Sequence, residues 1–535
     1  MTAPRHLAPF CIAVTLALAS WAPKAAASTI DRHAALLPSP AYAFQKAGNA
    51  ATVQTRKRTT RPPARRPVRV KPKPAPAPSW ARTEDPSQLA QRLTEALTSR
   101  TRSGQWGAMV VSLTKGDTLF AQNADGQMLP ASTMKMYTSA MALDRFGPDF
   151  VFKTPVLRDG PVGSDGGLSG NLFIRGVGDP SLSNRFWKGE SPMDALARQV
   201  VAAGIRHVRG DIIGDASAFD SQLIPDGWKR SYLGAAYAAR VSALSLNENL
   251  VWVAVRASGN TALVSLEPAT TTIPVKSTVK VVGGSGGRIT AARQPDGSIL
   301  VRGTVGRNSP PRKYSLVVDD PAMFTTGALR AALERAGVRI DGATRLGETP
   351  VSATEIAAVA SPPLSQIVGE MNRESINIVA ELLFRAAAAS ETQVGSAQNA
   401  ATALREFFST KVRSPTSLEA ADGSGLSELD RVTARSMVEL LGYAHASEWG
   451  SVFHASLPVE GESGTLRRRS TTPARGNLHA KTGTTNRVAS LGGFVTARNG
   501  EVLAFSFIYN GNDRGNARGA MDTMGATLAE FSRAH

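Results

Sequence analysis

Ser132 and Lys135 are the first residues of this sequence whose types and spacing could perform chemistry. They lie three positions apart at what reads as the first turn of a helix, so the hydroxyl and the amine share one helix face. A serine hydroxyl attacks carbonyls poorly at neutral pH, and a neutral lysine beside it can accept its proton. The N–H groups of the helix N-terminus would stabilise negative charge developing next to the serine. The pattern predicts a nucleophile with its own base.

Two further polar groups lie downstream. Ser375 and Asn377 are two positions apart inside an apparently helical region, and Lys481-Thr482-Gly483-Thr484 lies between strand-like runs. The tetrad S-x-x-K alone occurs by chance in many chains, so it indicates an active site only together with these groups. The order S-x-x-K, S-x-N, K-T-G resembles the signature of the penicillin-binding protein and serine β-lactamase superfamily.

Shorter blocks narrow the resemblance to one family. These blocks are Gly176–Leu182 (GVGDPSL), Ala243–Asn249 (ALSLNEN), Asp422–Ser427 (DGSGLS) and Gly464–Leu466 (GTL). Together with the three motifs they look like the D-alanyl-D-alanine carboxypeptidase/endopeptidase family, the low-molecular-mass class C penicillin-binding proteins. The similarity runs roughly from Asp85 to the end of the chain. Members of that family carry a large insertion between S-x-x-K and S-x-N, which agrees with the long gap here.

The resemblance implies the steps of a serine DD-peptidase. Ser132 would attack the carbonyl of the penultimate D-alanine of a peptidoglycan stem peptide, and Lys135 would accept its proton. Ser375 would relay a proton to the leaving D-alanine, and the backbone N–H groups of Ser132 and Thr484 would form the oxyanion hole. Lys135 can act as a base near pH 7 only if its pKa falls by about three units, through desolvation and a second cation such as Lys481.

Substrate contacts are implied for the remaining motif residues. Asn377 would hold the substrate amide, Thr482 would bind its terminal carboxylate, and Lys481 would attract that carboxylate. Gly483, which has no side chain, would let the substrate backbone lie against the strand. Asp220 and Asp226, early in the insertion, are candidates for contacting the amine of a dibasic stem residue; ordinary exposed turn aspartates are the alternative for each. No cofactor or metal is implied.

Two alternatives stay open at this point. A serine β-lactamase shares the acylation machinery, but this sequence lacks the E-x-x-L-N stretch of class A enzymes, and Ser375 stands where other β-lactamases have tyrosine. A non-catalytic cell-wall binding protein on the same scaffold would not need the complete set of motif residues. We therefore expect a peptidase that is acylated by penicillin and other β-lactam antibiotics.

The elements that must position these residues predict an α+β fold. We expect a penicillin-binding protein/serine β-lactamase-like catalytic domain, an antiparallel sheet flanked by helices, interrupted by a large β-rich insertion of two subdomains. The predicted division is residues 85–154 and 356–535 for the catalytic domain and 155–355 for the insertion. The strand-like ends of the folded sequence predict a sheet that combines both ends of the chain.

The first 84 residues are predicted to lie outside the folded domains. Residues 1–27 read as a secretory signal, with Arg5, an apolar run and a small-residue cleavage site, so we expect export to the periplasm or cell envelope. Residues 28–84 are rich in Ala, Pro, Arg and Lys, which predicts a disordered basic linker. Cys11 is the only cysteine and lies in the signal, so a disulfide or cysteine nucleophile is excluded from the mature chain.

The net charge of +18 is concentrated in this linker. One stretch of the linker contains no acidic residue and holds the basic residues Arg56, Lys57, Arg58, Arg61, Arg65, Arg66, Arg69, Lys71, Lys73 and Arg82. Such a segment could contact anionic cell-wall polymers or a membrane surface, or could be only a soluble spacer. Nucleic acid is not an expected partner because the signal removes the protein from it. The expected partners are peptidoglycan stem peptides and β-lactams.

Overall fold

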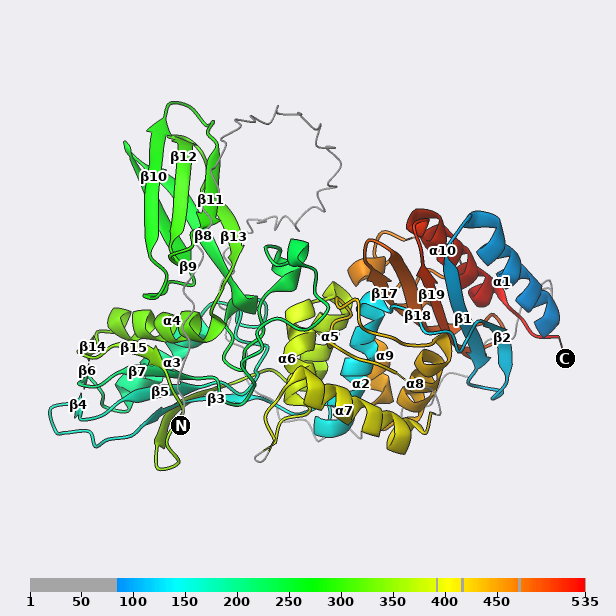
Figure 1. Ribbon diagram of the computed structural model, residues 1–535, viewed down its shortest axis with the longest axis horizontal. Coiled ribbons are helices and arrows are strands. Elements are labelled where there is room, and N and C mark those ends of the chain that lie inside the picture. The colour runs from blue at the N-terminus through cyan, green and yellow to red at the C-terminus, as the bar shows by residue number, and fades with distance from the viewer. Residues whose placement is uncertain (1–83, 391–392, 415–417, 470–472, 535) are drawn as a thin grey trace, which may run out of the picture. The chain divides into compact units, whose positions relative to one another are not determined.

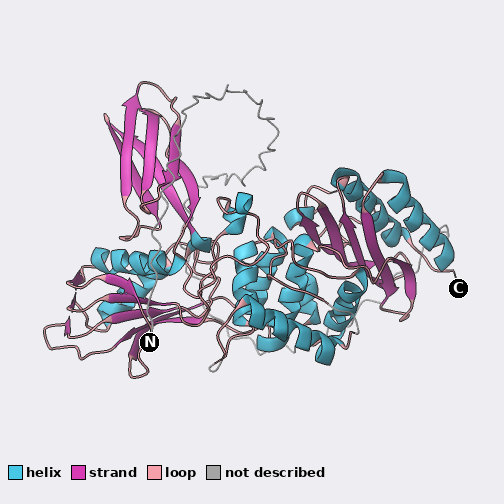
Figure 2. Ribbon diagram, viewed as in Figure 1, coloured by secondary structure: helices cyan, strands magenta, loops and turns pink. Residues whose placement is uncertain are grey.

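The computed structural model describes residues 84–390, 393–414, 418–469 and 473–534. The predicted signal and nearly all of the predicted linker lie outside these residues. In the part of the chain that is described, no helix is long and apolar enough to cross a membrane. Figure 2 shows the two kinds of region that follow, one in which helices surround a sheet and one dominated by strands.

A five-stranded sheet is the centre of the catalytic region, in the order β17-β18-β19-β1-β2. Its strands are β1 (Gln105–Ser112), β2 (Thr118–Gln122), β17 (His479–Thr484), β18 (Val488–Thr496) and β19 (Val502–Asn510). All neighbouring pairs are antiparallel, and Gln105 of β1 lies opposite Asn510 of β19. The sheet therefore combines both ends of the folded sequence, as predicted.

Helices cover both faces of this sheet (Figure 1). They are α1 (Pro86–Arg100) and α10 (Arg514–Glu530) on one face, and α2 (Met134–Phe146), α5 (Leu364–Glu374), α6 (Asn377–Ala386), α7 (Ala397–Phe407), α8 (Ala434–Ala446) and α9 (Gly450–Ser456) in the layer on the other. A hydrophobic core lies on each face of the sheet, and successive residues of β19 point into one core or the other. Phe505 and Phe507 pack with α1 and α10, whereas Ala504 and Ile508 pack with the larger helical layer. The sheet is buried on both sides.

The insertion begins and ends on one pair of strands. β3 (Lys153–Arg158) and β16 (Thr354–Ala360) are antiparallel, with Lys153 opposite Ala360, so the chain leaves and re-enters the catalytic region at neighbouring points. They form a five-stranded sheet in the order β15-β7-β5-β3-β16, beside a three-stranded sheet β14-β6-β4. The other elements of this layer are β4 (Gly167–Leu168), β5 (Leu172–Arg175), β6 (His207–Val208), β7 (Ile212–Asp215), β14 (Arg339–Ile340), β15 (Thr344–Leu346), α3 (Pro192–Ala202) and α4 (Pro321–Arg335).

Two three-stranded sheets form the rest of the insertion, in the orders β13-β8-β9 and β10-β12-β11. Their strands are β8 (Leu250–Ser258), β9 (Thr261–Glu267), β10 (Val275–Val282), β11 (Ile289–Arg293), β12 (Ile299–Gly306) and β13 (Arg312–Val317). A single core contains residues of these sheets and of α3 and α4. The α+β class is confirmed: an antiparallel sheet between helices, interrupted by a β-rich insertion.

Candidate active site

Ser132 and Lys135 lie where a short 3-10 turn, Ala131–Thr133, runs into α2. The Lys135 Nζ atom is 3.2 Å from the Ser132 Oγ atom. The serine is partly exposed, whereas the lysine is fully buried. A substrate can therefore reach the hydroxyl, while water is excluded from the amine beside it.

Two other oxygen atoms hold the Lys135 amine. It donates to the Asn377 side-chain Oδ1 and to the Ser424 backbone carbonyl, each at 2.7 Å. The contact with Ser132 is the longest of the three. An ammonium group can donate to all three oxygens, and a neutral amine can donate to two and accept from the third. The geometry thus allows the hydroxyl of Ser132 to donate to Lys135 once the lysine loses its proton.

Both motif lysines have lowered pKa values. Burial lowers the pKa of Lys135 to about 8, although the carboxylates of Asp422, Glu381 and Asp430 act in the opposite direction. Burial, and then the charge of Lys135, lower the pKa of Lys481 well below its ordinary value. The sequence argument named Lys481 as a cause of the shift in Lys135; in the structure desolvation is the main cause for both groups.

Ser375 lies in a break between α5 and α6. Its φ of 57° is left-handed and ends α5, and α6 begins at Asn377. The sequence placed this motif inside an apparently helical region, whereas in the structure it lies between two helices. Lys481 Nζ donates to Ser375 Oγ at 2.9 Å and to the Thr482 carbonyl at 2.8 Å. The break therefore directs the Ser375 hydroxyl at the second buried lysine.

Asn377 links the motifs to the insertion. Its Oδ1 accepts from Lys135, and its Nδ2 donates to the Tyr237 carbonyl at 2.8 Å. Each of these atoms retains a second hydrogen-bonding position that a ligand could use. Tyr237 itself is half exposed, at 50 %, and lies in a short 3-10 turn, Ala236–Ala238, of the segment that precedes β8.

The strand β17 lies tightly against the nucleophile turn at Gly483. A Cβ atom on this glycine would lie 2.1 Å from Ser490 Oγ, 2.7 Å from the Pro130 carbonyl and 3.0 Å from the Ser132 backbone nitrogen. Any side chain there would force the strand and the turn apart. Thr484, the other predicted oxyanion-hole residue, is the exposed last residue of the same strand.

The Thr482 hydroxyl is hydrogen-bonded to a second threonine. Its Oγ1 donates to Thr465 Oγ1 at 2.8 Å, and Thr465 is exposed. Thr482 directly follows Lys481 in the middle of β17, so its hydroxyl and that of Thr465 belong to the same part of the site as the Lys481 ammonium. That combination of donors and charge is suited to a carboxylate.

A buried acidic cluster, Glu381, Asp422 and Asp430, lies behind Lys135. Asp422 accepts from four backbone N–H groups of the loop 424–427 and from Trp228 Nε1 at 2.7 Å. Glu381 accepts from the N–H groups of Gly423 and Ser424. Burial and then the charge of Asp422 raise the pKa of Glu381 to about 8 and that of Asp430 well above its ordinary value. These carboxyl groups fix the loop whose carbonyl holds Lys135.

The two insertion aspartates are not among the groups that meet at Ser132. Asp220 forms an ion pair with Arg385, at 2.7 Å, and this guanidinium is fully buried. Asp226 is exposed and accepts from Gln222 Nε2 at 2.9 Å. The structure thus brings together Ser132, Lys135, Ser375, Asn377, Lys481, Thr482 and Gly483, with Thr484 at the strand end.

Sequence reasoning assigned no role to several groups that contact these residues. They are the carbonyls of Ser424 and Tyr237, the hydroxyl of Thr465, and the carboxyl of Glu381. The sequence held a signal for Ser424, which lies in the block DGSGLS, and for Thr465, which lies in the block GTL. Glu381 could also have been noticed, because it is a charged residue four positions after Asn377 in an otherwise apolar helical run, and residues at that spacing share one helix face.

Comparison with known proteins places these observations in a family. The sequence profile of the D-Ala-D-Ala carboxypeptidase 3 (S13) family matches residues 89–531. A D-alanyl-D-alanine carboxypeptidase of Actinomadura sp. (strain R39) is 34% identical over 446 residues, which cover 80% of this chain and 81% of the relative. The D-alanyl-D-alanine carboxypeptidase DacB of Haemophilus influenzae is 27% identical over 457 residues, 84% of this chain and 92% of the relative.

Solved structures share the fold. The crystal structure of penicillin binding protein 4 from Haemophilus influenzae superposes with a TM-score of 0.68 at 24% identity, covering 83% of this chain and 98% of that one. A second structure of that protein, complexed with a β-lactam, has a TM-score of 0.63 at 23% identity, with the same coverage. Both matches span the catalytic region and the insertion together.

Proposed function

Because this chain belongs to the D-Ala-D-Ala carboxypeptidase 3 (S13) family, and is therefore a serine-type D-Ala-D-Ala peptidase, we propose that Ser132 is the residue on which its acyl-enzyme forms. The observation that carries the proposal is the contact between Ser132 Oγ and Lys135 Nζ, at 3.2 Å. A buried amine whose pKa is about 8 has a far larger neutral fraction near neutral pH than an ordinary lysine has, and only the neutral amine can accept the proton.

The first half-reaction acylates Ser132. Lys135 takes the hydroxyl proton while Oγ bonds to the carbonyl carbon of the penultimate D-alanine. The oxyanion is stabilised by the N–H groups of Ser132 and Thr484, which belong to chain segments that approach closely at Gly483. The C–N bond then breaks as Ser375, held by Lys481, gives its hydroxyl proton to the departing amine and takes up the proton that Lys135 removed from Ser132, which leaves Lys135 neutral again.

The second half-reaction releases the product. Water attacks the acyl carbon while Lys135 accepts one of its protons; the bond between the acyl carbon and Ser132 Oγ then breaks, and Lys135 gives that proton to Oγ, so Ser132 regains its hydroxyl. The terminal carboxylate of the substrate binds to Thr482 and Lys481, and Asn377 holds the substrate amide through its unused hydrogen-bonding positions. The substrate is the D-alanyl-D-alanine end or cross-link of a peptidoglycan stem peptide. β-Lactams acylate the same serine.

Muropeptides of defined cross-linking test this function. Wild-type protein should release free D-alanine from pentapeptide monomers, split cross-linked dimers, or do both, and mass spectrometry identifies the products. Ser132→Ala should yield none of these products. If Ser132→Ala keeps the wild-type rate, another residue performs the reaction and the proposal is wrong.

A β-lactamase differs from a peptidase in how quickly the acyl-enzyme is hydrolysed. We propose that the penicilloyl-enzyme of this protein is long-lived, since the sequence lacks the deacylating E-x-x-L-N stretch. The adduct should persist on a gel after excess penicillin is removed. Rapid loss of the adduct, with hydrolysis of many penicillin molecules per enzyme, would instead favour a β-lactamase.

The same site is proposed to work in the cell envelope. Residues 1–27 have the pattern of a secretory signal, and the basic segment 28–84 is proposed to bind anionic cell-wall polymers or lipid head groups through many weak contacts. Removing residues 43–82 should leave hydrolysis of a soluble peptide unchanged and reduce retention on isolated sacculi or anionic vesicles at low salt. Equal retention of both proteins would make the segment a spacer only.

A further inference from the structure

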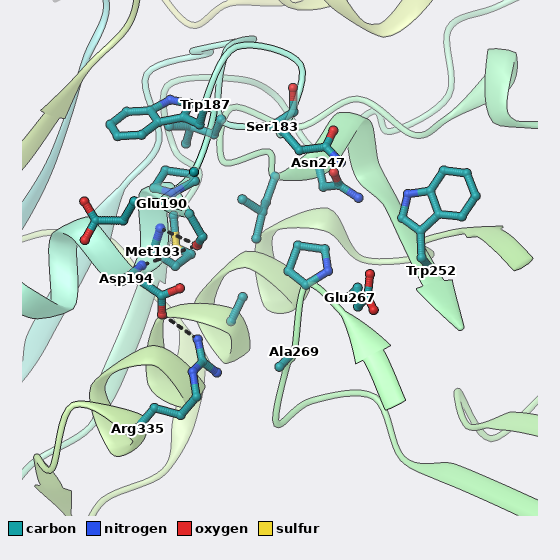
Figure 3. Close-up of a pocket in the computed structure, with 18 residues that line it drawn as sticks. Ser183, Trp187, Glu190, Met193, Asp194, Asn247, Trp252, Glu267, Ala269 and Arg335 are labelled. Carbon is teal, nitrogen blue, oxygen red and sulfur yellow. Dashed lines mark hydrogen bonds and ion pairs between the residues drawn. The ribbon is translucent and has the colours of Figure 1, made fainter. Parts of the chain in front are cut away.

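A cavity of about 320 Å³ lies in the insertion, away from Ser132. Its wall is formed by the loop 182–191, the start of α3, one face of β8, the end of β9, and α4 (Figure 3). This volume is within the range of sites that hold small molecules. None of the residues that meet at Ser132 lines it, so the peptidase chemistry does not account for it.

Two tryptophans form opposite ends of the cavity. Figure 3 shows Trp187, from the loop before α3, on one side and Trp252, from β8, on the other. Both indoles are half-buried, so part of each ring faces solvent. Neither indole N–H has a hydrogen-bond partner among the described residues. Each ring therefore offers an apolar face and a free donor to a ligand.

The charges around the cavity are balanced. Its three carboxylates each have a basic partner: Glu190 with Arg198 at 3.1 Å, Asp194 with Arg335 at 2.6 Å, and Glu267 with Lys313. A cationic or anionic ligand would have to compete with one of these pairs. The lining is thus suited to an uncharged ligand.

Polar residues contribute to the wall. Ser183 is 2% exposed, and its Oγ has no hydrogen-bond partner in the described structure. A buried hydroxyl without a partner costs free energy. Asn247 is 7% exposed and is held in the wall by donation from its Nδ2 to the Leu250 carbonyl at 2.8 Å.

We propose that this cavity binds a sugar ring of a glycan strand, an uncharged N-acetylhexosamine unit. Sugar rings have apolar C–H faces that stack on indoles, and hydroxyl and acetamido groups that pair with hydroxyls and amides. The proposal rests on the proposed function for the identity of the polymer, since peptidoglycan carries such sugars beside its stem peptides. The insertion then holds the glycan while the catalytic region acts on the peptide.

Titration with chitotetraose, the β-1,4 tetramer of N-acetylglucosamine, tests the site directly. Calorimetry and tryptophan fluorescence of the full-length protein should both report saturable binding. Trp252→Ala and Trp187→Ala should each weaken binding by at least about tenfold, and Ser183→Ala should weaken it less. Cellotetraose, which lacks the acetamido groups, should bind more weakly than chitotetraose.

The matched control is Tyr314→Ala. Tyr314 lies opposite Val253 in β13, so it projects from the sheet face opposite to that of Trp252, which pairs with Ser315. This variant should keep wild-type affinity. Absence of binding up to ~10 mM chitotetraose, or equal affinity of wild type and Trp252→Ala, would overturn the proposal.

Penicillin acylation, measured on every variant, separates this inference from the proposed function. Variants of the cavity should acylate at the wild-type rate, which also shows that they are folded. If wild-type protein bound chitotetraose but was never acylated, the proposed function would fail and the saccharide site would stand. The reverse result would remove only the saccharide site.

Discussion

Lys135 shows how burial can turn a lysine into a base. The ordinary pKa of a lysine would leave almost none of it neutral at pH 7. Desolvation lowers that pKa to about 8, so about one lysine in ten is neutral at pH 7. Since three carboxyl groups act against this shift, burial is the dominant cause, and the reaction should depend on pH accordingly.

The rate of penicillin acylation should rise with pH and level off above an inflection near pH 8. Because the neutral amine is the active form, each pH unit below the inflection should reduce the rate by about tenfold. Stopped-flow measurement of the second-order rate constant between pH 5.5 and 9.5 (a range set around the pKa of about 8) checks this. Lys135→Ala should lose about 10²–10⁴-fold in rate. A flat profile in the wild type would contradict the assignment.

Gly483 should tolerate no side chain. A Cβ there would lie 2.7 Å from the Pro130 carbonyl and 3.0 Å from the Ser132 nitrogen, so Gly483→Ala should displace β17 and slow acylation by at least about tenfold. Gly515→Ala is the matched control, because a Cβ at that position has no neighbour within 4 Å. Equal rates for the two variants would show that the close approach is not needed for catalysis.

At the scale of elements, the loop 422–427 connects the buried acidic cluster to the base. The Ser424 carbonyl holds Lys135, and Asp422 and Glu381 hold the N–H groups of the same loop. The loop also approaches the nucleophile turn closely, because a Cβ on Gly425 would lie 1.8 Å from the Ala131 carbonyl. Its φ of 80° also favours glycine. The cluster therefore acts on the chemistry through backbone position as well as charge.

Glu381→Gln should lower stability and move the pH profile. A glutamine can accept only one of the two backbone N–H bonds well, which leaves a buried donor unpaired at a cost of about 1–3 kcal/mol. The ionised Glu381 carboxyl raises the pKa of Lys135, and burial raises its own pKa to about 8, so its removal should shift the acylation inflection to lower pH through the fraction that is ionised there. Thermal melting and the pH profile measure these effects. Glu95→Gln on the exposed face of α1 should change neither, and an unchanged melting point for Glu381→Gln would contradict the structural role.

The sequence was most informative where chemistry is local. The S-x-x-K spacing identified Ser132 and Lys135, and the run K-T-G-T identified Lys481 and the residues after it. The resemblance to a known family explained the order of these motifs along the chain. The break at Ser375 was missed because the apolar residues on either side keep helical spacing, and a single left-handed residue leaves no trace in that pattern. The carbonyls of Ser424 and Tyr237 were missed because backbone oxygens are the same in every residue. Only the tertiary fold selects them.

At the scale of the whole molecule, the insertion contributes to the catalytic region through side chains and backbone. Trp228 donates to Asp422, the Tyr237 carbonyl accepts from Asn377, and Asp220 pairs with buried Arg385. The sequence predicted an α+β domain interrupted by a β-rich insertion. It could not predict these contacts, because the partners are far apart in the chain and belong to irregular segments.

Asp220 and Asp226 should behave differently when they are replaced. Asp220→Ala leaves the Arg385 guanidinium buried without its ion pair, so it should lower the melting temperature. Asp226→Ala removes an exposed carboxylate that accepts a hydrogen bond from the Gln222 side chain, so stability should be unchanged. Asp226→Ala is therefore the cleaner test of a contact with the amine of a dibasic stem residue. It should keep penicillin acylation and reduce turnover of a stem peptide with a free side-chain amine; equal loss on both substrates would refute that contact.

The identity of the nucleophile is tested most directly by locating the penicillin adduct. Wild-type protein labelled with a fluorescent penicillin should gain the mass of one acyl group per chain, and peptide mapping should place it on Ser132. Ser132→Ala, with its melting temperature unchanged, should gain none. An adduct on any other residue, or a labelled Ser132→Ala protein, would contradict the account of this active site.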